Sequence, residues 1–278
     1  DPGDFPEGSE TNYDIAPAEC GSVTVYYEGE SFYMIAYGDN DDYFAIYNST
    51  DGDSWEKQGI VFDGTGLPGY SKLDAPYLFE DNGTFRLYFQ VKAEDGSIYS
   101  IYTAETDDTL AEIADGNDDS DFVLANNDNP VLEPEAIDEW DGKYVMHPMV
   151  IKEDNVYYMW YSAHNSNQPQ QIGFASSEDG YTWVKSTGNP IISRDNYLAV
   201  GEPSVIHDDD GIWRMWYLAT GNQIKYLTAT GPFEFSSIQS AIDAADDGDT
   251  INAAEGIYVE DILMNVPVSY THLRAHET

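Results

Sequence analysis

The chain has 278 residues, with 11 lysines and arginines against 52 aspartates and glutamates, so its formal net charge is −41 at pH 7. Such a surface repels phosphate, which excludes nucleic-acid binding and attachment to anionic lipid. Aromatic residues make up 14% of the chain, which excludes an acidic disordered protein, because such chains are poor in aromatics. We therefore expect a folded, acidic protein of the kind that works in high salt, where screening weakens self-repulsion.

Cysteine content and hydropathy narrow the classes further. Cys20 is the only cysteine, so neither an intrachain disulfide nor a cysteine-based metal site can form. No apolar run approaches the roughly 18 residues that a membrane span needs. The chain opens on Asp1 without an initiator methionine or an apolar leader, and we interpret it as a mature form or a fragment of a secreted protein. The oligomeric state stays open.

Four segments repeat one pattern along the chain. Each has a small or acidic pair, an apolar strand, a polar turn and a run of alternating aromatics. The aromatic runs are residues 32–37, 85–89, 157–161 and 213–217. Spacings of 55, 72 and 55 residues separate the anchor positions Gly21, Pro76, Pro148 and Pro203.

Further strands and turns complete the repeat. Residues 44–55 and 172–183 each alternate apolar and polar positions and then turn through Asp-Gly, which is the hairpin signal. About four strands in a repeat of this length is typical of a β-propeller blade. The 17 extra residues of the middle interval fall within residues 105–130, which are rich in Asp and Asn and are predicted to form a long surface loop.

The sequence therefore predicts an all-β propeller over residues 1–233. Four repeats are visible, and a further blade is either reduced to residues 1–18 or cut off before the propeller is complete. Residues 234–267 resemble the capping helix and first coil of a right-handed parallel β-helix of the pectate-lyase type. Residues 268–278 hold two of the five histidines and resemble sequencing-adapter read-through, so we interpret them as a non-native tail.

Over about residues 19–233, the repeats resemble the five-bladed propeller glycosidases of the arabinanase, β-xylosidase, invertase and levansucrase superfamily, including glycoside hydrolase family 43. The most specific matching pieces are residues 172–183, residues 189–192 and the aromatic runs that start at Tyr157 and Trp213. The resemblance implies that inner strands deliver a base or nucleophile Asp, a tuning Asp and a general-acid Glu before Pro to a central funnel. One protonated and one ionised carboxyl suit an oxocarbenium-like transition state.

Carried over to this chain, the resemblance implies four catalytic candidates. Glu202 precedes Pro203 and matches the general acid, and Asp74 matches a carboxylate on a strand that faces the funnel. His147 stands where the tuning Asp is expected, and Glu19 stands where the base Asp is expected. The alternatives are a structural cap for Glu202, a turn residue before X-Pro for Asp74, and a hydrogen-bonded core residue for His147.

Substrate contacts and cofactors complete the expectations. Arg194, Trp160 and Trp216 are candidate sugar contacts, with a surface ion pair or core packing as the alternatives. The runs 39–42 and 208–210 are solvated turns or, alternatively, Ca²⁺ sites, and no other cofactor or metal is expected. We expect a secreted glycoside hydrolase that acts on a polysaccharide or oligosaccharide. The alternative is a non-catalytic carbohydrate-binding or cell-surface adhesive protein.

Overall fold

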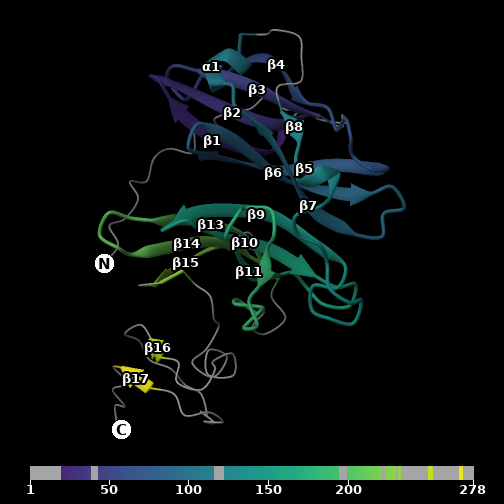
Figure 1. The fold of residues 1–278 in the computed structure, drawn as a ribbon, viewed down its shortest axis with the longest axis vertical. Coiled ribbons are helices and arrows are strands. Elements are labelled where there is room, and N and C mark those ends of the chain that lie inside the picture. Colours follow the sequence, from purple (N-terminus) through teal and green to yellow (C-terminus); the bar gives the residue numbers. More distant parts are fainter. Residues whose placement is uncertain are drawn as a thin grey trace.

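A computed structural model describes residues 20–38, 43–115, 122–193, 199–220, 223–229, 231–232, 250–252 and 269–271. Within these residues the structure is almost entirely β-strand, as Figure 1 shows. This confirms the all-β prediction. Glu19, Arg194 and the run 39–42 lie outside the described residues.

The strands form four antiparallel sheets in chain order, which we call blades 1 to 4. Blade 1 consists of β1 (Cys20–Glu28), β2 (Ser31–Gly38), β3 (Phe44–Ser49) and β4 (Glu56–Phe62). Blade 2 consists of β5 (Tyr70–Asp81), β6 (Thr84–Ala93), β7 (Tyr99–Thr106) and β8 (Val123–Leu124). Blade 3 consists of β9 (Tyr144–Glu153), β10 (Val156–His164), β11 (Gln171–Ser177) and β12 (Val184–Lys185). Blade 4 consists of β13 (Val200–His207), β14 (Trp213–Ala219) and β15 (Gln223–Ala229).

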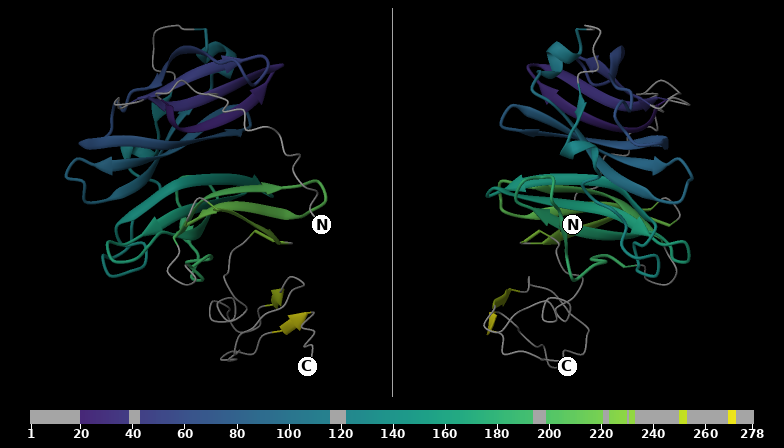
Figure 2. Two further views of the ribbon diagram at one scale, coloured as in Figure 1. Left: turned by 180° about the vertical axis from the view of Figure 1, so that it is seen from behind. Right: turned by 45° about the vertical axis from the view of Figure 1, so that its right-hand side comes forward.

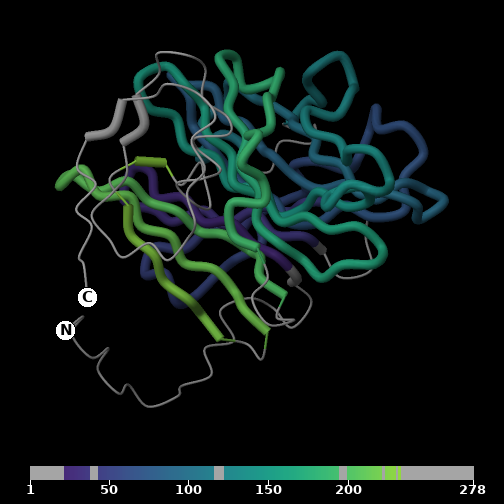
Figure 3. Tube along the Cα trace, turned by 90° about the horizontal axis from the view of Figure 1, so that it is seen from below, coloured from purple at the N-terminus to yellow at the C-terminus, as the bar shows by residue number. Residues whose placement is uncertain are grey.

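Successive blades pack face to face, in the manner of a propeller. The first strand of each blade contacts the first strand of the next: β1 lies against β5, β5 against β9 and β9 against β13. The two further views in Figure 2 show the same succession of sheets, and Figure 3 follows it from the purple strands of blade 1 to the light-green strands of blade 4. One parallel pair, Tyr99 with Tyr144, joins β7 of blade 2 to β9 of blade 3.

The aromatic runs are the second strands of the blades, and both faces of these strands are buried. Along β6, Phe85, Leu87 and Phe89 pack into the core shared with blade 1. Tyr88 points the other way, into the core shared with blade 3. Because side chains alternate along a strand, a strand between two blades must be apolar on both faces. This explains the unbroken aromatic runs.

Two turns with the sequence Ser-x-Asp-Gly-x-Ser/Thr-Trp are built alike. In the turn at Asp179, Oδ1 accepts the main-chain N–H groups of Tyr181 and Thr182 at 2.8 and 2.7 Å. The Trp183 indole donates to the Gly180 carbonyl at 3.0 Å. The turn at residues 49–55 repeats these bonds around Asp51. These local bonds fix the turn, which confirms the two Asp-Gly hairpin signals.

The predicted loop at residues 105–130 is partly regular structure, which corrects the expectation of an irregular loop. It contains α1 (Leu110–Ile113), β8 and the 3₁₀ turn η1 (Asn126–Asp128). Helix α1 forms because Thr109 and Glu112 make a capping box, and Leu110 and Ile113 are buried in the core of blades 1 and 2.

Two short strands lie further along the chain. β16 (Thr250–Asn252) pairs in parallel with β17 (Ser269–Thr271). β16 falls in the predicted β-helix segment 234–267 and β17 in the predicted tail 268–278, and the other residues of both segments lie outside the described residues. Among the described residues, no helix is both long enough and apolar enough to cross a membrane.

Candidate active site

A bulge interrupts the first strand of every blade at the same place. In blades 2, 3 and 4 the bulged residue precedes a proline and has a left-handed backbone, with φ of 49° at Ala75, 49° at His147 and 51° at Glu202. Such a backbone costs a non-glycine residue about 1–2 kcal/mol. A bulge also re-aims the side chain and removes its N–H from the ladder, so that this N–H needs another partner.

The bulges shift the alignment of the repeats by one residue. The strand ladders place four residues at the last paired position before the bulge: Cys20, Asp74, Met146 and Gly201. Ser22 therefore aligns with the three prolines, and the expectation that Gly21 does so is wrong, because the bulge itself takes up one residue. Glu202 and His147 share one position, and Asp74 stands one residue earlier in its blade.

Asp74 is held by three donors from two blades. Its Oδ1 accepts the Ser22 hydroxyl of blade 1 at 3.0 Å and the main-chain N–H of Ala75 at 2.8 Å. Its Oδ2 forms an ion pair with Lys72 at 2.5 Å, and the Asp74 side chain is 17% exposed. Asp74 thus satisfies the N–H of its own bulge and keeps a paired negative charge near the surface.

His147 is tied to blade 2 and to its own blade. Its main-chain N–H donates to Gln90 Oε1 at 3.1 Å. Its Nδ1 lies 3.5 Å from Gln170 Nε2. Gln90 is the strand partner of Asp74 and is buried, so one side chain fixes the relative positions of the two bulges.

Glu202 is held in the same way from blade 3. Its main-chain N–H donates to Ser162 Oγ at 2.8 Å, and Ser162 occupies in β10 the position that Gln90 occupies in β6. A Cβ on the preceding Gly201 would lie 2.1 Å from Gln170 Nε2, so glycine is required for this close approach. The Glu202 side chain itself is exposed, free to meet a ligand.

The electrostatics of His147 connect the three bulge residues. Burial lowers the pKa of His147 below its ordinary value of 6.5, the carboxylates of Glu202 and Asp74 act to raise it, and the Lys72 ammonium lowers it further. The structure therefore brings Asp74, His147 and Glu202 from three successive blades into one electrostatic cluster. Burial favours a neutral imidazole between the two carboxylates at neutral pH.

Sequence reasoning missed the residues that hold this cluster: Ser22, Lys72, Gln90, Ser162 and Gln170. A signal for two of them was present, because Gln90 and Ser162 are polar residues at the same place in otherwise apolar second strands. Nothing in the local pattern marks Gln170 or Lys72.

The other predicted site residues lie apart from the cluster. Trp160 is fully buried in the core of blades 3 and 4 against Phe174 and Trp213, so it cannot form a sugar platform, and core packing is the correct alternative. Trp216 is half-buried and packs against Tyr226 at 5.2 Å. Its role as a sugar contact stays a prediction.

The acidic run 208–210 is engaged with a cation of the chain itself. Asp208 and Asp210 both form ion pairs with Arg214. An arginine thus occupies these carboxylates, and this arrangement favours a solvated turn over a Ca²⁺ site. Within the described residues no group of three or more His, Cys, Asp and Glu side chains could hold a metal ion.

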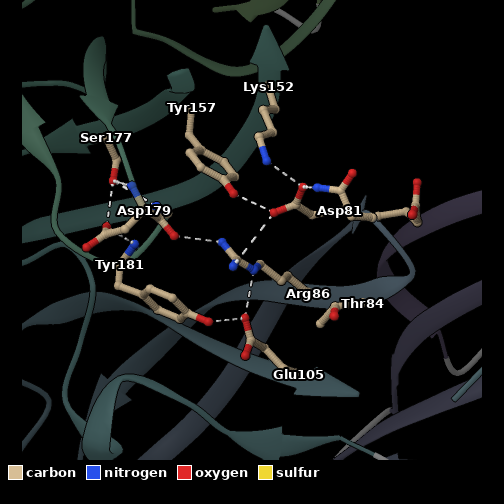
Figure 4. Close-up of polar contacts among 12 residues, drawn as sticks. Asp81, Thr84, Arg86, Glu105, Lys152, Tyr157, Ser177, Asp179 and Tyr181 are labelled. Carbon is tan, nitrogen blue, oxygen red and sulfur yellow. Dashed lines mark hydrogen bonds and ion pairs between the residues drawn. The ribbon is translucent and has the colours of Figure 1, made fainter. Parts of the chain in front are cut away.

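A second polar cluster lies between blades 2 and 3, and Figure 4 shows its contacts. Arg86 lies between the carboxylates of Asp81 and Glu105, at 3.8 and 2.7 Å. Asp81 also pairs with Lys152 at 2.6 Å and accepts the Tyr157 hydroxyl. Arg86 donates in addition to the main-chain carbonyl of the Asp179 turn at 2.9 Å. These groups satisfy one another, and their role is to join the two blades.

Comparison with known proteins gives a family match over the blades. The family model described as "Glycosyl hydrolases family 32 N-terminal domain" matches residues 78–230. "Uncharacterized protein MT1551" of Mycobacterium tuberculosis (strain CDC 1551 / Oshkosh) is 32% identical over 102 residues. That match covers 34% of this chain and 34% of the relative, so the chain spans about a third of the length of this curated relative.

Solved structures share the fold at low sequence identity. The GH43_1 enzyme from Xanthomonas citri, solved with xylotriose, is 18% identical with a TM-score of 0.55, and the match covers 79% of this chain and 72% of that one. The Penicillium chrysogenum alpha-L-arabinanase, solved with arabinobiose, is 16% identical with a TM-score of 0.55 and coverage of 81% and 66%. These likenesses support a propeller architecture.

Proposed function

The chain belongs to the family of the glycosyl hydrolases family 32 N-terminal domain, and from that premise we propose that it hydrolyses O-glycosidic bonds of a polysaccharide or oligosaccharide. Glu202 serves as the general acid and Asp74 as the ionised partner carboxylate. The observation that carries this proposal is the convergence of Asp74, His147 and Glu202 from three successive blades.

The surroundings of each carboxylate fit its role. Glu202 is exposed on a strained bulge, where it can transfer a proton to the leaving glycosidic oxygen. Asp74 accepts hydrogen bonds from three donors, which suits a carboxylate that stays ionised and stabilises positive charge on the sugar ring in the transition state. A neutral His147 places no cation beside Glu202. It contributes as a positioning residue through Gln90 and Gln170.

Hydrolysis of a panel of neutral aryl-glycosides and of arabinan by the whole chain, in about 1 M salt, tests the proposal. Glu202→Gln keeps the size and the main-chain bond to Ser162 and removes only the transferable proton. General acid catalysis contributes about 10²–10⁴-fold, so we expect kcat to fall by that factor. For substrates with good leaving groups the loss should be smaller, because such groups need less protonation.

Glu153→Gln is the matched control, because Glu153 is a carboxylate at the far end of β9, paired with His207 at 2.7 Å. Its hydrolysis rate should equal that of the unmodified chain. Equal rates for Glu202→Gln and the unmodified chain would eliminate Glu202 as the acid.

A non-catalytic, carbohydrate-binding role is the second candidate. One observation favours it: the Asp74 carboxylate is engaged with the N–H of its own bulge, and the aligned positions of blade 1 are Cys20 and Gly21 rather than an acid. Saturable binding of an oligosaccharide with no hydrolysis of any substrate in the panel would favour this role.

The setting of the protein is part of the proposal. The charge of −41 supports work in high salt, and an extracellular polysaccharide substrate supports secretion. The parallel pairing of β16 with β17 supports a β-helix after the propeller. A rise of the melting temperature between about 0.1 and 2 M NaCl is the expected sign of adaptation to salt, because screening removes self-repulsion.

A further inference from the structure

Three lysines of this cation-poor chain gather around one pair of tyrosines. The rings of Tyr99 on β7 and Tyr144 on β9 meet edge to face, with centroids 5.1 Å apart. Lys92 Nζ lies 5.8 Å from the centroid of the Tyr99 ring, and Lys143 Nζ lies 4.8 Å from that of Tyr144. Lys72, the strand partner of Lys92, also interacts electrostatically with Tyr99. We call these five residues the lysine–tyrosine patch.

The patch adjoins the proposed catalytic cluster. Lys72 forms the ion pair with Asp74 and lies 4.9 Å over the Tyr37 ring. At the opposite end, the His164 ring packs on Tyr144 with centroids 4.6 Å apart. All five members of the patch are half-buried. A row of rings and cations therefore leads away from Asp74 along the junction of blades 2 and 3.

The charge of the patch has no counterpart within the described part of the chain. The described lysines that form ion pairs with carboxylates are Lys72, Lys152 and Lys185. Lys92 and Lys143 form none, although acids outnumber cations by 52 to 11 in the chain. Two cations that lie over aromatic rings, rather than beside the abundant carboxylates, leave their donors available for an anion from outside.

We propose that the lysine–tyrosine patch binds an anionic group carried by a sugar ring, next to the sugar whose bond is cleaved. The inference rests on the proposed function and narrows its substrate class to acidic glycans. The chemistry is shared by a uronate carboxylate and a sulfate ester: lysine ammonium groups bind the charged oxygens, and the tyrosine rings pack on the apolar face of the sugar.

Two matched ligand pairs test the inference by titration calorimetry with the whole chain. One pair is trigalacturonate and its methyl ester, and the other is a sulfated galacto-oligosaccharide and its desulfated form. Measurement at about 0.5 M NaCl reduces the screening length to about 4 Å, so that the distant carboxylates no longer repel the ligand. We expect the charged member of one pair to bind at least about tenfold more tightly, and that pair identifies the anion.

Lysine variants then locate the effect. Lys92→Gln and Lys143→Gln should each reduce the preference for the charged ligand by about threefold to tenfold, the size of one charge-assisted contact. Lys57→Gln is the matched control, because Lys57 Nζ also lies over a tyrosine ring, 4.9 Å from the centroid of Tyr43, but on the outermost strand of blade 1. It should leave the preference unchanged.

Several outcomes would overturn the inference: equal affinity within both pairs, no binding of either charged ligand, or a preference that survives the double variant Lys92→Gln/Lys143→Gln. The catalytic proposal fails separately. If Glu202→Gln hydrolyses neutral aryl-glycosides at an unchanged rate while the charge preference persists, only the assignment of the acid is wrong. If hydrolysis depends on Glu202 and no charge preference exists, only the acidic-glycan inference is wrong.

Discussion

Ser162 in blade 3 accepts the main-chain N–H of Glu202 in blade 4 at 2.8 Å. This bond holds the left-handed bulge on which the proposed acid is carried. Ser162→Ala leaves that N–H without its partner, and we expect a loss of about 1–2 kcal/mol in the free energy of unfolding. Because the Glu202 side chain loses its fixed position, we also expect kcat to fall by about tenfold, measured with the best neutral substrate.

Ser100→Ala controls for the removal of a buried hydroxyl. Ser100 is buried on β7 and stands away from every bulge. It should change the unfolding free energy by less than about 1 kcal/mol and leave kcat intact. An unaltered rate in Ser162→Ala would show that the bulge holds its shape without this bond.

The structural and chemical roles of Asp74 can be separated by two substitutions. Asp74→Asn keeps an oxygen that accepts the N–H of Ala75 and the Ser22 hydroxyl, but it removes the charge. We expect kcat to fall by about 10²-fold or more, while the urea midpoint changes little. Asp74→Ala also leaves the bulge N–H unpaired and should cost a further 1–3 kcal/mol, approximately, in urea unfolding. Full activity in Asp74→Asn would restrict Asp74 to the structural role.

His147 should make stability depend on pH in a defined direction. Its pKa in the folded chain lies below 6.5 because of burial, so the unfolded chain takes up a proton first as the pH falls. The contribution to stability is therefore fully present above about pH 6.5 and is lost below it, toward the folded pKa. Relative to the unmodified chain, His147→Gln should gain stability between pH 7.5 and pH 5 in chemical unfolding. A constant difference across this range would contradict the expectation.

Arg86 should matter to stability rather than to catalysis. Its side chain is 11% exposed and faces the Asp81 and Glu105 carboxylates, so Arg86→Met leaves buried acids without their cation, which typically costs about 3–5 kcal/mol. We expect the melting temperature to fall by about 6–15 °C. Arg214→Gln breaks a more exposed pair with Asp208 and Asp210 and should lower the melting temperature by no more than about 3 °C. Similar losses in both variants would contradict the difference in burial.

The local features were predictable because their causes are local. The Asp-Gly turns form from bonds between residues two or three apart, as at Asp179. The aromatic second strands show in the sequence because both faces of such a strand are apolar. Helix α1 escaped prediction because it has only four residues, too few to show a helical period, and depends on a capping box and two buried side chains.

By itself, the sequence determined the class of fold, the repeats and the presence of Glu202, Asp74 and His147 at blade starts, since strand periodicity and turn chemistry are written in neighbouring residues. Only the tertiary structure decided that Ser22 rather than Gly21 aligns with the prolines, that Trp160 is core, and that Gln90 and Ser162 hold the bulges of the following blades. These relations join residues 40 to 57 positions apart along the chain. Their physical cause is the bulge, which frees an N–H that only a side chain from the neighbouring sheet can satisfy.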